Sequence, residues 1–449
     1  MSDLEKDIVV VGGSAAGLTA AITAHRQYPD KSVLLVRKEE QVVIPCGIPY
    51  VFGTVGSPEK NLIPDALLEK NDIALQLGEV ARIDSEKSVM ELEDGLTIAY
   101  DRAIVATGSL PAMPPIPGFD NPNVYGVYKN VPAIAELQKN LKDVRKLVIL
   151  GGGFIGIEFA DECRKAGIEK VTIVEMLPHC LMLSFDEEFA VEAERRLVER
   201  GVELKTGERV ERFEGDGKVE RVVLAGGESL ETDAVIMGIG AVANVKLAKD
   251  SGLKLGPTGA ISVDRTMKTS APGVFACGDC AEKVSFFGGR PSPLKLASIA
   301  SSEARIAGSN LYGVRRESIG TIGVWSTAIG DFALACGGLT EKMAQDAGYD
   351  CVAGAAEGPN RHPGCMPGAE TIKIKLLFER RTGVLVGGQM MGSKSVGELI
   401  NVISACIQQR MTFDDMAVFQ IGTHPALTCS PVGYQLVNAA EMAFQKISR

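Results

Sequence analysis

The sequence lacks a run of eighteen consecutive apolar residues, and we therefore expect no membrane-spanning helix. Its first residues, MSDLEKD, lack the basic segment and apolar core of a secretory signal peptide. Its ten cysteines have no regular spacing, so a disulfide framework is not expected. These absences predict a cytoplasmic protein with reduced thiols.

Positive charge is in deficit, with 47 Lys and Arg against 57 Asp and Glu and a net charge of -10. Nucleic acids and anionic membranes are bound through clustered basic residues, so this balance disfavours both partners and favours small molecules. Only four histidines are present. His362 and Cys365 could form a metal pair, but no second cluster has zinc spacing, and we assign no metal.

At 449 residues the chain is too long for one hydrophobic core, and we expect three domains. Residues 7–17 read as a strand followed by a glycine turn, then a helix and a second strand at 32–36. The same order recurs over 146–167, with a strand at 171–175. The fold class is therefore α/β with two Rossmann-like dinucleotide-binding domains.

The remaining segments differ in texture. Residues 202–224 look like antiparallel strands, a strand follows at 234–240, and a Gly/Pro-marked return occupies 271–282. From about residue 321 strands such as 371–378 accompany a long helix around 395–410, with no further glycine fingerprint. This pattern predicts a C-terminal α+β domain.

The second glycine turn has the complete G-x-G-x-x-G pattern in Gly151, Gly153 and Gly156, and Glu175 ends the next strand. The glycines permit a tight turn and close approach to a pyrophosphate, and Glu175 can accept a hydrogen bond from a ribose 2′-hydroxyl. Because a carboxylate repels a 2′-phosphate, NADH is favoured over NADPH.

The first glycine turn departs from the pattern. It comprises Gly12, Gly13, Ser14, Ala15, Ala16 and Gly17, with Ser14 at the usual place of the middle glycine. The end of the second strand, normally acidic, carries Arg37, followed by Lys38 and Glu39, and Glu39 is a candidate replacement for the acid. Taken alone, this segment also fits an α/β turn without a nucleotide.

Five stretches share a resemblance to one family: VVVGGSAAGLTAA, YDRAIVATGSLPAMPPIPG, LVILGGGFIGIEFA, TSAPGVFACGDCAE and GTHPALTCSP. The chain resembles the FAD- and NAD(P)-dependent pyridine nucleotide-disulfide oxidoreductases along essentially its whole length. The resemblance implies a discontinuous FAD-binding domain (1–116 and 246–320), an NAD-binding domain (117–245) and a C-terminal dimerisation domain (321–449). It also implies a homodimer in which the third domain supplies the interface and part of each active site.

The resemblance further implies candidate residues for binding FAD and NADH outside the residues already named. Asp279 is the aspartate that contacts the ribityl chain of the flavin in the family. The other candidates are Pro45, Val80, Ala106, Thr107, Gly108, Phe154, Ile155, Glu158, Gly240, Gly278, Leu296 and Ala297. Arg26 is a candidate substrate-binding residue, since relatives that use coenzyme A present an arginine there, although an arginine at a helix end is usually solvated.

One cysteine, Cys46 in VVIPCGIPYVFG, lies between Pro45 and Gly47. An isolated cysteine is usually a small buried apolar residue. PCGIPY, however, resembles the single-cysteine branch of the family, which includes coenzyme A disulfide reductases, persulfide or polysulfide reductases, NADH oxidases and NADH peroxidases. Position 51, where the two-cysteine branch has its second cysteine, is Val51. We therefore predict that Cys46 is the redox-active residue.

The predicted acid is His424, which occupies a place similar to the His-Pro of the two-cysteine enzymes. The orienting glutamate of the family is replaced by Cys429, which could act as a second thiol or be a buried loop cysteine. His424 could equally be a structural turn residue, and His25 and His179 fit packed or solvated roles. Cys277 and Cys280 form a C-x-x-C that we interpret as structural, because Asp279 within it belongs to the flavin motif.

These features favour an FAD-dependent enzyme that uses NADH to reduce a low-molecular-weight disulfide, persulfide or polysulfide. The acceptor sulfur would form a mixed disulfide with the Cys46 thiolate. An NADH oxidase or peroxidase, working through a cysteine sulfenic acid, shares every motif. A flavin redox sensor, or an electron-transfer component for a protein partner, is an alternative of another class.

Overall fold

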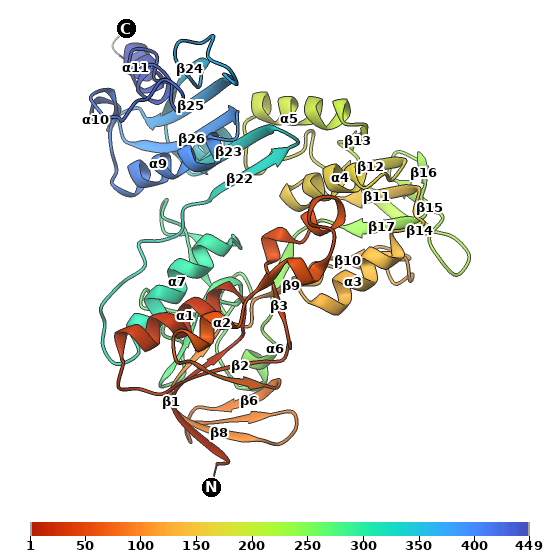
Figure 1. Cartoon of the computed structure of the whole chain (residues 1–449), viewed down its shortest axis with the longest axis vertical. Helices are drawn as coiled ribbons and strands as arrows, with labels where there is room; N and C mark the ends of the chain where they lie inside the picture. The colour runs from red at the N-terminus through yellow and green to blue at the C-terminus, as the bar shows by residue number, and fades with distance from the viewer. Residues whose placement is uncertain (1, 448–449) are drawn as a thin grey trace. The chain divides into compact units, whose positions relative to one another are not determined.

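A computed structural model describes residues 2–447 and separates them into two compact units (Figure 1). Of the described residues, unit 1 contains 2–114, 125–143 and 240–321, and unit 2 contains 115–124, 144–239 and 322–447. Among the described residues, no helix combines the length and the apolar character that crossing a membrane requires.

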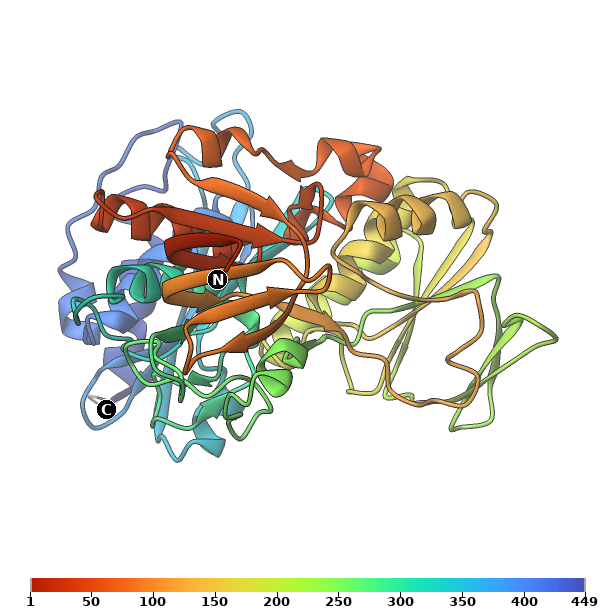
Figure 2. The same ribbon diagram turned by 90° about the horizontal axis from the view of Figure 1, so that it is seen from below.

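Unit 1 is built on a seven-stranded sheet whose central strand β1 ends in four nearly inaccessible residues, Ile8–Val11. Because both faces of this strand are covered, it reads as a continuous apolar run, as parallel strands buried on two sides do. β1 pairs in parallel with β2 and β8, and the antiparallel ribbon of β6, β7 and β8 is drawn in orange in Figure 2. The strands are β1 (Leu4–Val11), β2 (Val33–Arg37), β5 (Ala74–Leu77), β6 (Val80–Asp84), β7 (Val89–Leu92), β8 (Thr97–Val105) and β19 (Val274–Ala276).

Two helices of unit 1, α1 (Ala15–Gln27) and α7 (Ala297–Ser309), pack side by side, as Figure 1 shows. Their shared core contains small residues such as Ala20, Ala24 and Ala304. A Cβ on Gly308 would lie 2.7 Å from the carbonyl oxygen of Ala20, so only glycine permits this approach. The remaining elements are α2 (Ala66–Glu69), α3 (Val131–Asn140), α6 (Lys246–Asp250), β3 (Val42–Val43), β4 (Leu62–Ile63), β9 (Ser109–Pro111), β18 (Ala241–Ala243), β20 (Lys283–Val284) and β21 (Pro291–Ser292).

Unit 2 contains a five-stranded sheet in the order β10, β17, β11, β12, β13, in which β11 pairs in parallel with β12 and β17. The segment 202–206, expected to be antiparallel, is β13 and pairs in parallel with β12, so that expectation was wrong. The antiparallel prediction is confirmed for β14 and β15, and β16, which lies beyond the predicted segment, pairs with β15 in the same direction. The elements are β10 (Val124–Gly126), β11 (Lys146–Leu150), β12 (Lys170–Glu175), β13 (Val202–Thr206), β14 (Val210–Glu214), β15 (Arg221–Leu224), β16 (Ser229–Glu231), β17 (Ala234–Met237), α4 (Phe154–Lys165) and α5 (Glu187–Glu199).

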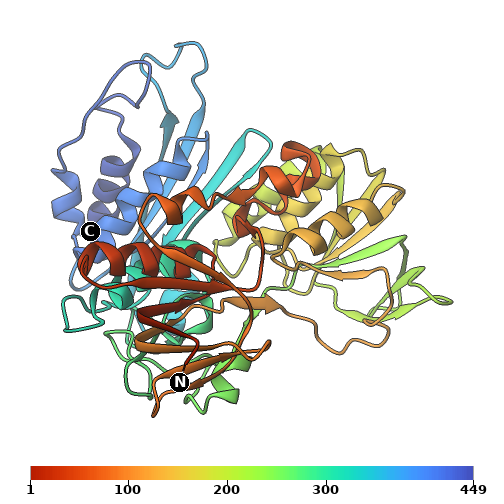
Figure 3. The same cartoon turned by 60° about the horizontal axis from the view of Figure 1, so that its bottom comes forward.

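The C-terminal part of unit 2 is a five-stranded antiparallel sheet in the order β22, β23, β26, β25, β24. Helix α9 packs against β22, β23 and β26, while α11 packs against β24 and β25 (Figure 3). The elements are β22 (Val324–Ile329), β23 (Phe332–Gly338), β24 (Cys351–Pro359), β25 (Thr371–Glu379), β26 (Leu385–Gly392), α8 (Glu341–Asp346), α9 (Val396–Gln408), α10 (Phe413–Ala417) and α11 (Gln435–Ile447). The strand and the helix predicted here are confirmed as β25 and α9.

The two halves of unit 2 contact each other through aromatic and charged side chains. Phe154 of α4 packs against Trp325 of β22 with ring centroids 5.6 Å apart. Lys375 of β25 lies 2.9 Å from Asp186, the N-cap residue of α5. Residues 125–143, which the sequence analysis placed in the NAD-binding domain, group with unit 1. The three-domain division as a whole stays a prediction.

Candidate functional site

The first glycine turn connects β1 to α1 and is held against the end of β8. Gly12 has φ +116°, and a Cβ there would lie 2.2 Å from the carbonyl oxygen of Ala106. A Cβ on Gly17 would lie 1.8 Å from the carbonyl oxygen of Gly12. Neither position can carry a side chain without moving the backbone, which explains both glycines.

The N-terminus of α1 is open to an anion. Its N-cap residue Ser14 makes no side-chain capping hydrogen bond, and its first turn contains no acidic residue. The N-terminal N–H groups of a helix and its dipole favour negative charge, so an uncapped end after a glycine turn suits a pyrophosphate. Ser14, which stands in place of the usual middle glycine, therefore leaves the N-terminus of α1 accessible to a pyrophosphate.

The turn that contains Asp279 lies beside this helix. Gly278 has φ +80°, and a Cβ there would lie 2.7 Å from the Cβ of Ala16. Asp279 accepts hydrogen bonds from Ser109 Oγ at 2.7 Å and from Lys129 Nζ at 3.2 Å. Burial acts to raise the pKa of Asp279, but the charge of Lys129 and the two hydrogen bonds outweigh it, so the pKa lies below its usual value. Asp279 is therefore an ionised hydrogen-bond acceptor.

A buried ion pair supports this turn from below. Lys283 Nζ lies 3.3 Å from Glu303 Oε2 and donates to the carbonyl oxygen of Gly278 at 2.7 Å. Glu303 accepts the N–H of Gly278 at 2.9 Å. Burial raises the pKa of Glu303 to about 7.

Cys46 lies on an exposed 3₁₀ turn, Pro45–Gly47. Asn61, which is buried, holds this turn by donating from Nδ2 to the carbonyl oxygen of Ile44 at 2.9 Å, and Ile44 N donates to the carbonyl oxygen of Asn61. A Cβ on Gly47 would lie 2.1 Å from Asn61 Oδ1, so the turn requires glycine after the cysteine. The thiol is thus presented on a braced turn rather than on a loose loop.

The remaining predicted residues of unit 1 differ in exposure. Val80 is buried in β6, and Lys38 is exposed and lies 3.5 Å from Glu79. Thr107 Oγ1 donates to the carbonyl oxygen of Asn244 at 2.8 Å, and Asn244 N donates to the carbonyl oxygen of Gly108. These two hydrogen bonds join the segment around Thr107 to the segment around Asn244. Exposed Gly240 has φ +97°. Leu296 is the N-cap residue of α7 and Ala297 its first residue, and this end also lacks a side-chain cap.

The second glycine turn repeats the first in unit 2. A Cβ on Gly156 would lie 1.8 Å from the carbonyl oxygen of Gly151, whereas no atom lies within 4 Å of the corresponding position on Gly153. Glu175 accepts the N–H of Gly152 at 2.7 Å and that of Leu177 at 2.8 Å. The carboxylate of Glu175 is therefore fixed beside the glycine turn, and the space next to Gly153 is open.

Helix α4 carries the other predicted residues of this turn. Ile155 is 39% exposed, whereas Phe154 packs against Phe185 and Trp325. Glu158 accepts a hydrogen bond from Thr327 Oγ1 of β22 at 2.9 Å. Burial raises the pKa of Glu158 to about 7, although the bond from Thr327 acts to lower it.

His424 and Cys429 lie together on a loop before α11. His424 is exposed, and its Nδ1 accepts the N–H of Ala426 at 3.2 Å. Cys429 is 5% exposed, donates to the side chain of Gln435, and has a pKa raised by burial. His362 on the neighbouring loop donates from its backbone N–H to the carbonyl oxygen of Pro425 at 3.1 Å. A role for Cys429 as a second thiol stays a prediction, and its burial favours the alternative of a buried loop cysteine.

The family model of the pyridine nucleotide-disulphide oxidoreductases matches residues 6–304, and that of their dimerisation domain matches residues 324–432. The chain belongs to this family. Three proteins illustrate the likeness. An NADH oxidase of Enterococcus faecalis is 32% identical over 92% of this chain and 94% of its own length. An NAD(P)H coenzyme A polysulfide/persulfide reductase of Pyrococcus horikoshii is 34% identical over 87% and 88%. The structure of an NAD-dependent persulfide reductase from A. fulgidus superposes with a TM-score of 0.91 at 30% identity, covering 98% of this chain and 84% of the other.

Membership confirms the predicted α/β fold and an FAD-dependent NAD(P)H oxidoreductase with FAD and NADH as cofactors. The residues at the two glycine turns fit FAD and NADH, because each turn leads into a helix whose N-terminus has no side-chain cap and can bind a pyrophosphate. Which residues hold each cofactor stays a prediction.

Cys277 and Cys280 are completely buried, and burial raises the pKa of both thiols. Cys280 Sγ lies 3.4 Å from the carbonyl oxygen of Cys277, within the turn that presents Asp279. This placement supports a structural role for the C-x-x-C. Across residues 2–447 no three His, Cys, Asp or Glu side chains are grouped as a metal would require.

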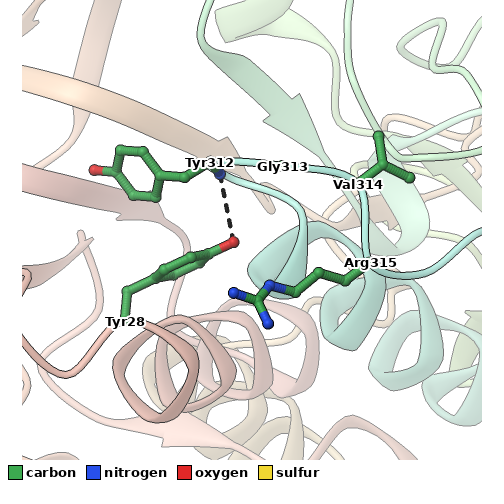
Figure 4. A pocket seen from close by; sticks show the side chains of 5 residues that line it. All are labelled: Tyr28, Tyr312, Gly313, Val314 and Arg315. Carbon is green, nitrogen blue, oxygen red and sulfur yellow. Dashed lines mark hydrogen bonds between the residues drawn. The ribbon is translucent and has the colours of Figure 1, made fainter.

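Arg26 is exposed at the last turn of α1 and donates to Asn71 Oδ1 at 3.3 Å. A hollow of about 310 Å³ lies near this end of the helix, lined by Tyr28, Tyr312, Gly313, Val314 and Arg315 (Figure 4). The Tyr28 hydroxyl donates to the carbonyl oxygen of Ser309 at 2.6 Å and accepts from Tyr312 N at 3.4 Å. No residue predicted for cofactor or substrate binding lines it.

Sequence reasoning missed four side chains that hold the predicted ones: Ser109, Lys129, Asn61 and Thr327. Lys129 is 150 positions from Asp279, and Thr327 is 169 positions from Glu158. No local motif marks Lys129 or Thr327 as a partner, because each is brought to its site by the fold.

Proposed function

We propose that this oxidoreductase uses NADH to reduce a low-molecular-weight disulfide, persulfide or polysulfide of the coenzyme A type through Cys46. The observation that carries the proposal is the exposed Cys46 on its braced turn, with the fully buried Val51 in place of a second cysteine. The names of the relatives from P. horikoshii and A. fulgidus support the acceptor class.

In this proposal the Cys46 thiolate attacks one sulfur of the acceptor. The sulfur–sulfur bond breaks, the leaving sulfur takes a proton, and the other half remains on Cys46 as a mixed disulfide. When bound, FAD would accept a hydride from NADH and supply the two electrons that cleave this bond. The protein would work as a homodimer in the cytoplasm. Its dimerisation domains would bring the loop that carries His424 to Cys46 of the second copy, and His424 would donate the proton.

A second candidate is an NADH oxidase, because the relative from E. faecalis bears that name and matches nearly the whole chain. The oxidant would then be a peroxide derived from oxygen: the Cys46 thiolate attacks one peroxide oxygen and becomes a sulfenic acid, the oxygen–oxygen bond breaks, and the other oxygen leaves as hydroxide.

The test is NADH oxidation by the FAD-loaded protein under anaerobic conditions, with coenzyme A disulfide or polysulfide as the acceptor. We expect turnover by the wild type and by Cys365→Ser, a control at another exposed cysteine, and loss of turnover in Cys46→Ser with its flavin retained. Oxygen uptake at full rate without any sulfur acceptor would instead establish the oxidase.

A further inference from the structure

Arg37 stands at the end of β2, where a dinucleotide-binding domain usually has an acid for the ribose. Its side chain is only 3% exposed. Nη1 and Nη2 donate to the two carboxylate oxygens of Asp65 at 2.6 and 2.7 Å. Nε donates to the carbonyl oxygen of Glu39 and Nη2 also to that of Glu40, both at 2.8 Å. The guanidinium is therefore bound on all three of its nitrogens by protein atoms.

The stem of the same side chain packs on the first glycine turn. A Cβ on Gly13 would lie 2.5 Å from Arg37 Cδ and 3.1 Å from a methyl group of Val42. Gly13 thus leaves the space through which Arg37 passes. The aliphatic part of Arg37 thus contacts the first glycine turn, and its guanidinium binds the segment that follows β2.

That segment, residues 38–65, is named here the thiol loop, since it carries Cys46. Arg37 and Asp65 close its two ends, which lie 28 positions apart. Inside this closure, β3 and β4 pair at Val42 with Ile63, and Asn61 binds Ile44 directly before the cysteine turn. A fork-to-fork arginine–carboxylate pair fixes direction as well as distance, so the closure sets where the loop emerges from the sheet.

We propose that Arg37 is a positioning residue for Cys46 and not a ligand of the FAD ribose. Asp65 is its partner, and the pair replaces the nucleotide contact at this strand end with a clamp on the thiol loop. The importance of this clamp for catalysis rests on the proposed function, in which Cys46 reacts with the acceptor. The clamp itself is measurable without any acceptor.

The test uses the FAD-loaded protein and the variants Arg37→Lys and Asp65→Asn. Lysine keeps the charge but loses the fork, and asparagine removes the charge at the partly exposed end of the pair. Trypsin cleavage after Lys60, an exposed residue of the thiol loop, reports its opening, and cleavage after exposed Lys218 in unit 2 is the internal reference. Glu79→Gln removes an exposed ion pair near the same strand end and is the matched control.

We expect cleavage after Lys60 to become about tenfold faster in both variants, the ratio given by a loss of about 1.4 kcal/mol. The rate at which iodoacetamide alkylates Cys46 should change in both variants. Their flavin content and their rate of trypsin cleavage after Lys218 should stay as in the wild type and the control. Loss of flavin with unchanged cleavage after Lys60 would show that Arg37 is a nucleotide contact and overturn the proposal. Unchanged cleavage, alkylation and flavin content would also overturn it.

Two results keep the test decisive. If Arg37→Lys fails to fold, Asp65→Asn alone decides, because its side chain is 47% exposed and leaves Arg37 bonded to two carbonyl groups. If Cys46→Ser retains full turnover, the proposed function fails, while faster cleavage in the clamp variants would still establish the clamp.

Discussion

Replacing Glu303 by glutamine should remove a pH dependence of stability from unit 1. Burial raises the pKa of this carboxyl from 4.5 to about 7 in the folded state. A raised carboxyl pKa means that the folded protein holds a proton that the unfolded chain has lost, so stability falls as the pH rises from the unfolded to the folded value. The loss is nearly complete at about pH 8, one unit above the folded-state pKa.

The magnitude follows from the two pKa values. Between pH 5 and pH 8 the wild type should lose about 2.5 kcal/mol of stability from this group, since one pKa unit corresponds to about 1.4 kcal/mol. Glu303→Gln has no such group. Glutamine can still accept from Gly278 and Lys283, and any constant cost of the substitution cancels when the two pH values are compared. The stability difference between wild type and variant should therefore change by about 2.5 kcal/mol in favour of glutamine.

The assay is urea unfolding of the FAD-loaded protein at pH 5, 6, 7 and 8 at one ionic strength, followed by the fluorescence of the released flavin, whose predicted site lies in unit 1. Asp7→Asn is the control, because the hydrogen bond from Lys31 lowers the pKa of Asp7 to about 2, so its titration lies outside this range. A difference between wild type and Glu303→Gln that stays constant from pH 5 to pH 8, or that changes in the opposite direction, would refute the reasoning.

Three further variants address the nucleotide sites and the second thiol. Glu175→Ala should raise the KM for NADH about tenfold and reduce the preference for NADH over NADPH, because one charged hydrogen-bond acceptor contributes about 1.5–3 kcal/mol. Steady-state kinetics with both nucleotides will measure this. An unchanged preference for NADH would argue against a contact between Glu175 and the ribose. Gly156→Ala should abolish NADH binding with FAD retained, since the added Cβ would lie 1.8 Å from a backbone oxygen; NADH titration followed by flavin absorbance measures it, and normal affinity would contradict the close packing. Cys429→Ala should leave the oligomeric state on non-reducing gels unchanged if Cys429 is a buried loop cysteine, whereas loss of a covalent dimer formed on oxidation would establish it as the second thiol.

The sequence predicted the parts of the fold that local patterns control. The strand, glycine turn, helix and second strand predicted at each glycine fingerprint follow from residues within one short segment, and the structure confirms them as β1, α1 and β2 and as β11, α4 and β12. The direction of pairing of β13 was misjudged, because VELKT alternates like an antiparallel strand, whereas its parallel pairing with β12 at the edge of the sheet depends on α5 returning the chain across the sheet. Direction of pairing is a property of the connection and not of the strand.

The candidate site was predictable to the same extent. Cys46, Asp279 and Glu175 stand in recognisable local patterns, whereas the residues that fix them are distant in sequence. Lys129 reaches Asp279 only because the chain returns to unit 1 after residue 124. The burial of Glu303 and the partial burial of Glu158 were equally hidden, since a carboxylate in a helix is normally solvated and only the neighbouring elements remove its water.

Arg37 and Glu175 occupy equivalent positions, each at the end of the second strand of a nucleotide unit. Glu175 can turn back onto its own glycine turn because a carboxylate accepts the backbone N–H groups that point there. A guanidinium only donates, so Arg37 finds no partner among those N–H groups and must reach acceptors elsewhere. The nearest set is the carbonyl groups of Glu39 and Glu40 and the carboxylate of Asp65. The same strand end can thus set nucleotide preference in unit 2 and anchor the thiol loop in unit 1.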